Sequence, residues 1–290
     1  MKRNLFAIKV VIMTFFIVAA NSTTAFPQAK KADGKQVMLA YNPQAGRILS
    51  CSHSTSVTQM MDVEGQSVNV LINTILDYKA KLINKQNDNL NLEITIDSLK
   101  IDMEAMGNAT GGNFSEVKGK SFPLIISPAG KVLDASGADK IEYSSEGQTF
   151  SSLGQTFRNL FPVLPGRSVG IGEKWTSKDT LDFASSGAKV YQIFESSGTY
   201  EGNEKVDGIE CARISVSLKG TMETKTQNMG MDIFVHGPVT GESVIWFAIK
   251  DGYVVKEQNT SKMNGTVELT GPQNMSFPVI MDTSTKLIVK

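Results

Sequence analysis

The chain has 290 residues, of which 41% are hydrophobic and 20% charged, and its 29 Lys and Arg balance its 29 Asp and Glu. A chain of this length can bury a substantial core without disulfide staples. It has no basic excess and no basic stripe interleaved with aromatic residues, so nucleic acid is excluded as an expected partner.

The N-terminus has the pattern of a cleavable secretory signal. A basic start is followed by a mostly apolar stretch over 5–20, and the small residues Thr23 and Ala25 stand at the −3 and −1 positions. The stretch contains Lys9 and is short of the ~20 residues that cross a bilayer, with an uncleaved signal anchor as the alternative. The first cysteine is Cys51, too late for a lipid anchor. We therefore expect a signal peptide over 1–25, export to the periplasm or beyond, and no integral membrane span in the mature chain.

The rest of the chain is expected to be one β-rich domain. Residues 26–36 are polar and rich in breakers, which predicts a mobile leader. Residues 37–290 are expected to form the domain, in two halves that meet near 162–172. The first long strand alternates, with serines filling most of one face and the other face carrying Leu49, Cys51, His53, Thr55 and Val57.

A long hairpin is predicted next. Residues 67–83 fit both a helical stripe and two strand phases joined by a bulge, and their β-branched content favours strand. After a turn signal at 87–89, residues 90–104 alternate and change phase near Ser98, as a β-bulge does.

The second half supports a mainly β class. Residues 149–161 have apolar spacing for a short helix that Pro162 ends. Trp175 is expected to be buried at the start of a strand, and a Lys-Asp-Gly turn at 250–252 predicts a hairpin. Roughly twelve strands and one helix indicate a mainly β protein, with α+β possible. The expected architecture is a strongly curved antiparallel sheet, as a half-barrel or a sandwich, with the short helix packed on one face.

No catalytic, metal or cofactor motif is recognised. His53 has serines around it, but they alternate along one strand and offer no nucleophile elbow, so it is interpreted as a histidine on a sheet face. His236 stands alone, and no cluster has zinc spacing. The glycine-rich stretch 166–172 lacks the Lys–Ser/Thr ending of a phosphate loop. We expect no catalytic residue, no metal and no cofactor.

Two cysteines leave two alternatives open. Cys51 and Cys211 could form a disulfide, which an oxidising compartment permits. Each also lies in a strand-like stretch, where a lone cysteine is commonly a small buried apolar residue.

A candidate apolar ligand wall comes from two alternating stripes. The chain has 13 methionines, and flexible thioethers line adaptable apolar surfaces, although they also simply fill cores. If the stripes face one interior, they form an apolar wall without charge. The candidate residues are Leu92, Ile94, Ile96, Met229, Met231 and Ile233.

Three further segments carry a resemblance. They are Leu-Ala-Tyr-Asn-Pro-Gln-Ala-Gly at 39–46, the stretch 161–175 that ends in Gly-Glu-Lys-Trp, and the hairpin around 246–253. Together they resemble a family of uncharacterised secreted or lipid-anchored bacterial β-rich proteins. The arrangement is also similar to the lipoprotein-carrier superfamily, which implies a half-barrel that wraps helices around an apolar cavity. No functional residue is implied by either resemblance.

Two functional hypotheses follow. The first is a non-enzymatic exported binding or carrier protein for an apolar or lipid-like ligand. The alternative is a structural or protein-interaction module of the cell envelope without a small-molecule ligand.

The signal peptide gives a first testable prediction. We expect cleavage after Ala25, because Thr23 and Ala25 satisfy the small-residue rule of signal peptidases. Mass spectrometry of the exported protein should give a mature chain that begins at Phe26, and an exported form that still begins at Met1 would contradict this.

Overall fold

The computed structural model describes residues 36–144, 151–185, 188–228, 230–271 and 274–290. The predicted signal peptide, nearly all of the leader and the start of the predicted 149–161 helix lie outside these residues. The strands are β1 (Val37–Leu39), β2 (Ile48–Val63), β3 (Gln66–Gln86), β4 (Asn89–Ala105), β5 (Asn108–Asn113), β6 (Ser121–Ile126), β7 (Val132–Asp134), β8 (Glu142–Tyr143), β9 (Ser151–Ser152), β10 (Arg167–Val169), β11 (Lys174–Ser185), β12 (Ala188–Val206), β13 (Ile209–Asn228), β14 (Met231–Ala248), β15 (Tyr253–Thr270) and β16 (Met275–Val289). The helices are η1 (Ser115–Val117), α2 (Ser136–Asp139) and α3 (Gly154–Arg158).

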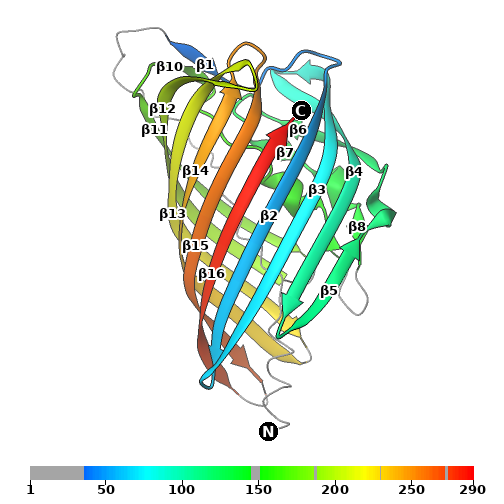
Figure 1. Cartoon of the computed structure of the whole chain (residues 1–290), viewed down its shortest axis with the longest axis vertical. Coiled ribbons are helices and arrows are strands. Elements are labelled where there is room, and N and C mark those ends of the chain that lie inside the picture. Colours follow the sequence, from blue (N-terminus) through cyan, green and yellow to red (C-terminus); the bar gives the residue numbers. More distant parts are fainter. Residues whose placement is uncertain (1–35, 145–150, 186–187, 229, 272–273) are drawn as a thin grey trace.

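One strongly curved antiparallel sheet of 12 strands dominates the molecule. Its order is β11-β12-β13-β14-β15-β16-β2-β3-β4-β6-β7, and β5 pairs with β4 outside this path. The last strand, β16, pairs with β2, so the two halves of the chain meet in the middle of the sheet. In the described part of the chain no ladder joins the edge strands β11 and β7, so the sheet is a half-barrel (Figure 1).

Tight turns join the long strands in register. Two-residue loops at Glu64-Gly65, Asn87-Asp88, Met106-Gly107 and Asp207-Gly208 have positive φ at both residues. This is the conformation of a type I′ turn, whose twist matches that of the flanking strands. The predicted turn at 87–89 lies at one of these loops.

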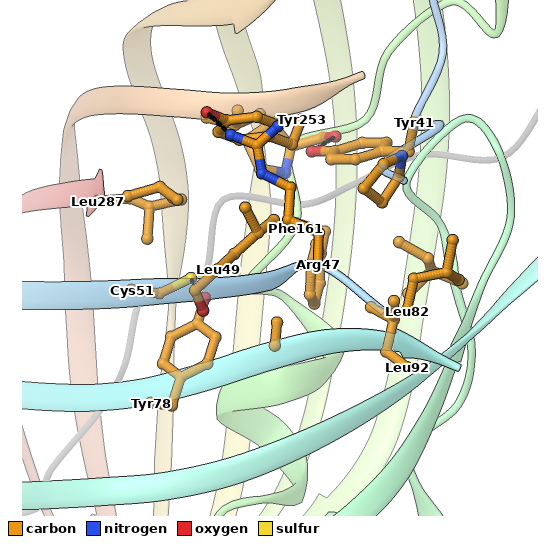
Figure 2. A pocket seen from close by; sticks show the side chains of 16 residues that line it. Tyr41, Arg47, Leu49, Cys51, Tyr78, Leu82, Leu92, Phe161, Tyr253 and Leu287 are labelled. Carbon is orange, nitrogen blue, oxygen red and sulfur yellow. Dashed lines mark hydrogen bonds between the residues drawn. The ribbon is translucent and has the colours of Figure 1, made fainter. Parts of the chain in front are cut away.

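Two apolar clusters fill the two ends of the half-barrel. The upper cluster lies where β1, β6 and the C-terminus meet, and it packs α2 and α3 against the concave face. Phe157 of α3 makes edge contacts with Tyr78 and Phe122, at centroid distances of 5.4 and 4.9 Å. Tyr78, Leu82 and Leu92 of β3 and β4 point into the same space as Tyr41 and Phe161 (Figure 2).

The lower cluster lies toward the β2–β3 hairpin and draws on both wings of the sheet. It includes Val70 of β3, Phe194 of β12, Met222 of β13 and Met263 of β15, each at most 1% exposed. Since β3 and β12 are far apart in the strand order, these contacts bring the concave faces of the two wings together.

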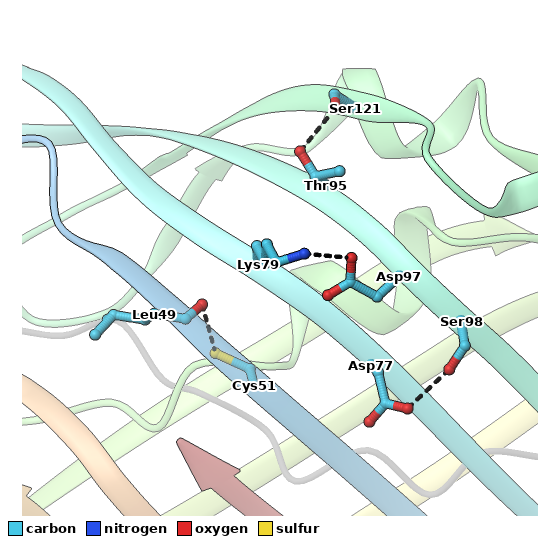
Figure 3. A network of polar contacts seen from close by, with 8 residues as sticks. All are labelled: Leu49, Cys51, Asp77, Lys79, Thr95, Asp97, Ser98 and Ser121. Carbon is cyan, nitrogen blue, oxygen red and sulfur yellow. Dashed lines mark hydrogen bonds and ion pairs between the residues drawn. The ribbon is translucent and has the colours of Figure 1, made fainter. Parts of the chain in front are cut away.

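A β-bulge separates two phases of β4. Asp77 pairs with Ser98 and Tyr78 with Ile96, so Asp97 is the extra residue. Inward positions change there from Ile94 and Ile96 to Leu99 and Ile101, as the sequence predicts. On the outward face, Lys79 donates to Asp97 at 2.8 Å and Ser98 to Asp77 at 2.7 Å (Figure 3).

The structure confirms a mainly β protein with a strongly curved antiparallel sheet, and of the two expected architectures it has the half-barrel. The predicted helix is shorter than expected, because the segment after Arg158 turns toward Pro162. Among the described residues, no helix is long and apolar enough to cross a membrane.

Trp175 is buried as predicted, at 5% exposure, and its ring lies against a glycine. Trp175 of β11 pairs with Gly198 of β12. A Cβ atom at Gly198 would come within 2.3 Å of the Trp175 ring. The absence of a side chain at 198 therefore makes room for the indole.

This contact gives a prediction about stability. Trp175→Ala should cost about 3–5 kcal/mol, as large aromatic truncations do. Gly198→Ala should also destabilise the protein, but much less in the Trp175→Ala background, where the clash is gone. Urea unfolding of the two single variants and the double variant measures this coupling. Strictly additive effects would show that the Trp175 ring is not the reason why position 198 lacks a side chain.

Candidate functional site

The register of the sheet aligns inward side chains in rows across the concave face. One row is polar over five successive strands, where directly paired positions carry Ser243 (β14), Asn259 (β15), Thr285 (β16), Thr55 (β2) and Thr74 (β3). Thr55 and Thr285 lie within hydrogen-bond distance of each other, at 3.4 Å. This polar row lies between the upper and lower apolar clusters.

The next row toward the upper cluster adds a carboxyl and an imidazole. Glu257 pairs with Leu287, and Leu287 pairs with His53, so the two polar side chains stand on either side of a leucine. At about 4.8 Å between neighbouring strands, their backbones are roughly 10 Å apart. They are therefore not positioned to hydrogen-bond to each other.

Helix α3 and the residues beside it cover these two rows. Between sheet and helix lies a pocket of about 80 Å³, which we call the polar chamber. Its lining from the sheet is His53, Thr55, Thr74, Leu76, Leu99, Glu257, Asn259 and Thr285, and from the covering segment Tyr143, Leu153, Gln155, Thr156, Asn159 and Leu160. Polar groups thus face the chamber from both sides, and its volume exceeds what a single water needs.

Glu257 is the charged group of the polar chamber. Burial raises its pKa from 4.5 to about 7, against a smaller opposing effect from Ser243, whose Oγ donates to Oε1 at 3.0 Å. A carboxylate can accept about four hydrogen bonds. Among the described residues, the structure shows one donor to Glu257, the hydroxyl of Ser243. The carboxyl group can therefore accept further hydrogen bonds.

His53 is neutral at physiological pH. Burial lowers its pKa from 6.5 to about 4. The serines that surround it in sequence occupy the opposite, outward face, where Ser54 bonds to the backbone of Lys286. Thus no serine–histidine pair is assembled at His53, which agrees with its interpretation as a histidine on a sheet face.

Thr74 adds an unpaired polar atom to the same chamber. Its Oγ1 is buried and has no hydrogen-bond partner among the described residues. Buried polar atoms are nearly always paired with protein or water. An orphaned hydroxyl in the wall of a pocket is therefore available to hydrogen-bond to a water or a ligand group.

A second, apolar pocket of about 40 Å³ adjoins the polar chamber on the side of the upper cluster. Cys51, Tyr78 and Leu287 line it, one inward position from His53, Leu76 and Thr285 of the chamber (Figure 2). We call it the apolar pocket. The lining residues of the two pockets follow one another along β2, β3 and β16, and we call this succession of lining residues the track.

Arg47 marks the outer rim of the apolar pocket. Its guanidinium lies 4.6 Å from the ring centroid of Tyr253 and donates to Asp251 at 3.0 Å. These contacts fix the side chain and balance its charge at the point where the track reaches the surface.

The structure does not bring the two predicted stripes of the ligand wall together. Leu92, Ile94 and Ile96 face inward in the upper cluster, and Leu92 also lines the apolar pocket. Ile233 and Met231 belong to the lower cluster, and Met229 lies outside the described residues. The expectation of one continuous wall without charge is corrected, because the polar row and Glu257 lie between the clusters.

The disulfide alternative for the two cysteines is also corrected. Cys51 and Cys211 are free and buried. Cys51 faces inward on β2, while Cys211 packs in a separate small cluster with Trp246 and Ala248. Strands β14, β15 and β16 separate β13 from β2, so the two thiols are too far apart to bond.

Neither thiol is poised to react, and no metal cluster is formed. Burial raises the pKa of Cys51 to about 12 and that of Cys211 to about 11. Thiols with such pKa values are inert near neutral pH. Within the described ranges, no group of three or more His, Cys, Asp or Glu could hold a metal ion.

Comparisons with known proteins do not identify a family. No family model matches the chain, and no curated protein matches it. The solved structures with some likeness include Pseudomonas aeruginosa OccK5, with 2% identity over 84% of this chain and 98% of that one, at a TM-score of 0.27. A Bacteroides fragilis protein described as exported, with a YmcC-like fold, has 11% identity over 84% and 97%, at 0.22. A DUF1329 family protein from Desulfovibrio piger has 10% identity over 80% and 83%, at 0.17. Likenesses this low carry no functional argument.

The two titratable groups of the polar chamber predict a compensated pH dependence of stability. Between pH 4.5 and 6.5 the folded state holds a proton on Glu257 that the unfolded state has lost, so stability falls as pH rises. Over the same range the folded state lacks a proton on His53 that the unfolded state holds, so stability rises. The two effects oppose each other.

Removing the Glu257 carboxyl should reveal the pH dependence of stability that His53 causes. Glu257→Gln should make the free energy of unfolding rise with pH relative to the wild type, by about 1 kcal/mol per pH unit between pH 4.5 and 6.5. Urea unfolding at several pH values measures this, with Glu242→Gln as the control, since Glu242 is exposed on the outward face of β14. A Glu257→Gln profile parallel to the wild type would contradict the assignment.

Proposed function

We propose that this protein is an exported, non-enzymatic binding or carrier protein for a lipid-like ligand held inside the half-barrel. The observation that carries the proposal is the track formed by the apolar pocket and the polar chamber. An apolar pocket that adjoins unpaired polar groups suits an amphipathic molecule, whose apolar body and polar head need different surroundings. The proposal that the protein is exported rests on the signal-like sequence of its N-terminus.

The arrangement of polar groups argues against catalysis. Acid–base and nucleophilic catalysis need side chains within hydrogen-bond reach of one another or of one reacting atom. His53 and Glu257 stand on either side of Leu287, and no described residue hydrogen-bonds to the His53 ring. The polar chamber therefore supports recognition by hydrogen bonds better than bond cleavage.

The alternative is a structural or interaction module of the envelope. It is favoured by the dense packing of apolar side chains at both ends of the half-barrel. Ile94 and Ile96 have 0% exposure, and Met263 and Met281 are equally buried. The two pockets are small, so only a short part of a ligand is enclosed, and a longer chain must leave by the rim at Arg47. Ligand binding separates the two hypotheses.

The test uses the mature chain and N-phenyl-1-naphthylamine, an uncharged apolar fluorescent probe, displaced by n-alkanols of increasing length. Each enclosed methylene contributes about 0.8 kcal/mol, close to a fourfold gain in affinity. We expect this gain for the first carbons and a plateau once the enclosed space is filled.

Ala80→Val should weaken binding at least about fivefold, because Ala80 lines the apolar pocket and overpacking costs about 1–3 kcal/mol. Ala105→Val is the matched control, since Ala105 is equally buried but belongs to the lower cluster. If the wild type binds neither probe nor alkanol, and native mass spectra of protein from its own host show no adduct, the structural module is the remaining hypothesis.

A further inference from the structure

We propose that the polar chamber binds a primary ammonium group, the cationic head of the amphipathic ligand, with the Glu257 carboxylate as its counter-charge. The inference rests on the proposed function and deepens it by naming the head group. It commits the ligand to an orientation in which the head lies under α3 and the apolar body extends along the apolar pocket toward Arg47.

The charge of the polar chamber supports a cation. Glu257 is its one acidic residue, and in the part of the chain that the structure describes no Lys or Arg lines it. The nearby arginines are engaged at the surface, Arg47 with Asp251 and Arg158 with Asp139. A buried carboxylate without a cation is costly, and a bound ammonium removes this cost. A carboxylate or phosphate head would meet repulsion instead.

The hydrogen-bonding groups of the polar chamber also match. An ammonium group has three donors and no acceptor. Beside Glu257 the polar row presents acceptors in the hydroxyl of Thr285 and the amide oxygen of Asn259, and the Thr55 hydroxyl lies one strand further along. The unpartnered Thr74 hydroxyl lies further along the same row. Carboxylate and neutral oxygens together can therefore satisfy all three donors.

Five other titratable groups lie near Glu257: Tyr143 on β8, which lines the chamber, and four that stay neutral at physiological pH. These four are His53 and Cys51 on β2, Tyr78 on β3 and Tyr41 before β2. Burial lowers the pKa of His53 to about 4, and it raises the pKa values of Cys51, Tyr78 and Tyr41. Binding of an ammonium group needs ionised Glu257, so the affinity should rise as pH increases from 5 to 8.

The experiment compares three ligands with one alkyl chain, decylamine, decanol and decanoate, by displacement of N-phenyl-1-naphthylamine from the mature chain at pH 8. We expect decylamine to bind at least tenfold more tightly than decanol, and decanoate most weakly. Glu257→Gln should abolish the preference for the amine while decanol still binds. Glu242→Gln, which removes a carboxylate one residue from Ser243 on the outward face, should keep the preference.

The possible failures are distinguishable. If none of the three ligands binds, the proposed function itself fails. If all three bind equally, or if Glu257→Gln keeps the preference for the amine, the ammonium site is overturned while lipid binding stands. A preference for decanoate would place the head at Arg47 instead and overturn the orientation. Butylamine bound as tightly as decylamine would overturn the amphipathic ligand in favour of a free amine.

Discussion

The register of the long antiparallel ladder determines which side chains face the interior of this protein. Side chains alternate between the two faces of a strand, so a slip of one residue would turn every inward group to the outside. Type I′ turns fix the register of four hairpins, and the bulge at Asp97 corrects the phase of β4 where the sheet bends. With this register, Ser243, Asn259, Thr285 and Thr55 form one row.

A polar row inside a β-rich protein opposes the hydrophobic effect that holds the fold together. Each buried polar atom without a partner costs about 1–3 kcal/mol, and the Thr74 hydroxyl in this row is such an atom. Two apolar clusters lie one on each side of the row. The apolar surface that they bury offsets this cost. Proteins commonly break the rules of core packing where they function, and this row is one of the places where the half-barrel breaks them.

Local patterns in the sequence predict much of the fold. Alternation and turn residues indicate the strands, the hairpin of β3 and β4, and the phase change near Ser98, because these features depend on neighbours in the chain. Trp175 is predictable as buried for the same reason. The choice of half-barrel over sandwich requires the pairing of β16 with β2, which joins distant segments and leaves no local signal.

The candidate site depends on the same distant pairings and is largely hidden in the sequence. His53 is visible as an inward residue of β2, but its row partners come from other strands. Glu257 is not singled out by the sequence, because a register shift between Trp246 and Phe247, opposite the start of β15, determines which face it takes. Alternation in the sequence places the two apolar stripes on one wall for a similar reason, since it does not reveal that they lie at opposite ends of the half-barrel.

The position of the last strand has a consequence for how the chain reaches its folded state. Residues 279–289 of β16 pair with residues 51–61 of β2, so the centre of the sheet joins segments from opposite ends of the chain. Contacts of such long sequence separation form late, and proteins dominated by them fold slowly. The central ladder cannot close before β16 has been made. During synthesis, which begins at the N-terminus, the edge of β2 opposite β3 therefore has no strand partner until residues 279–289 have been added.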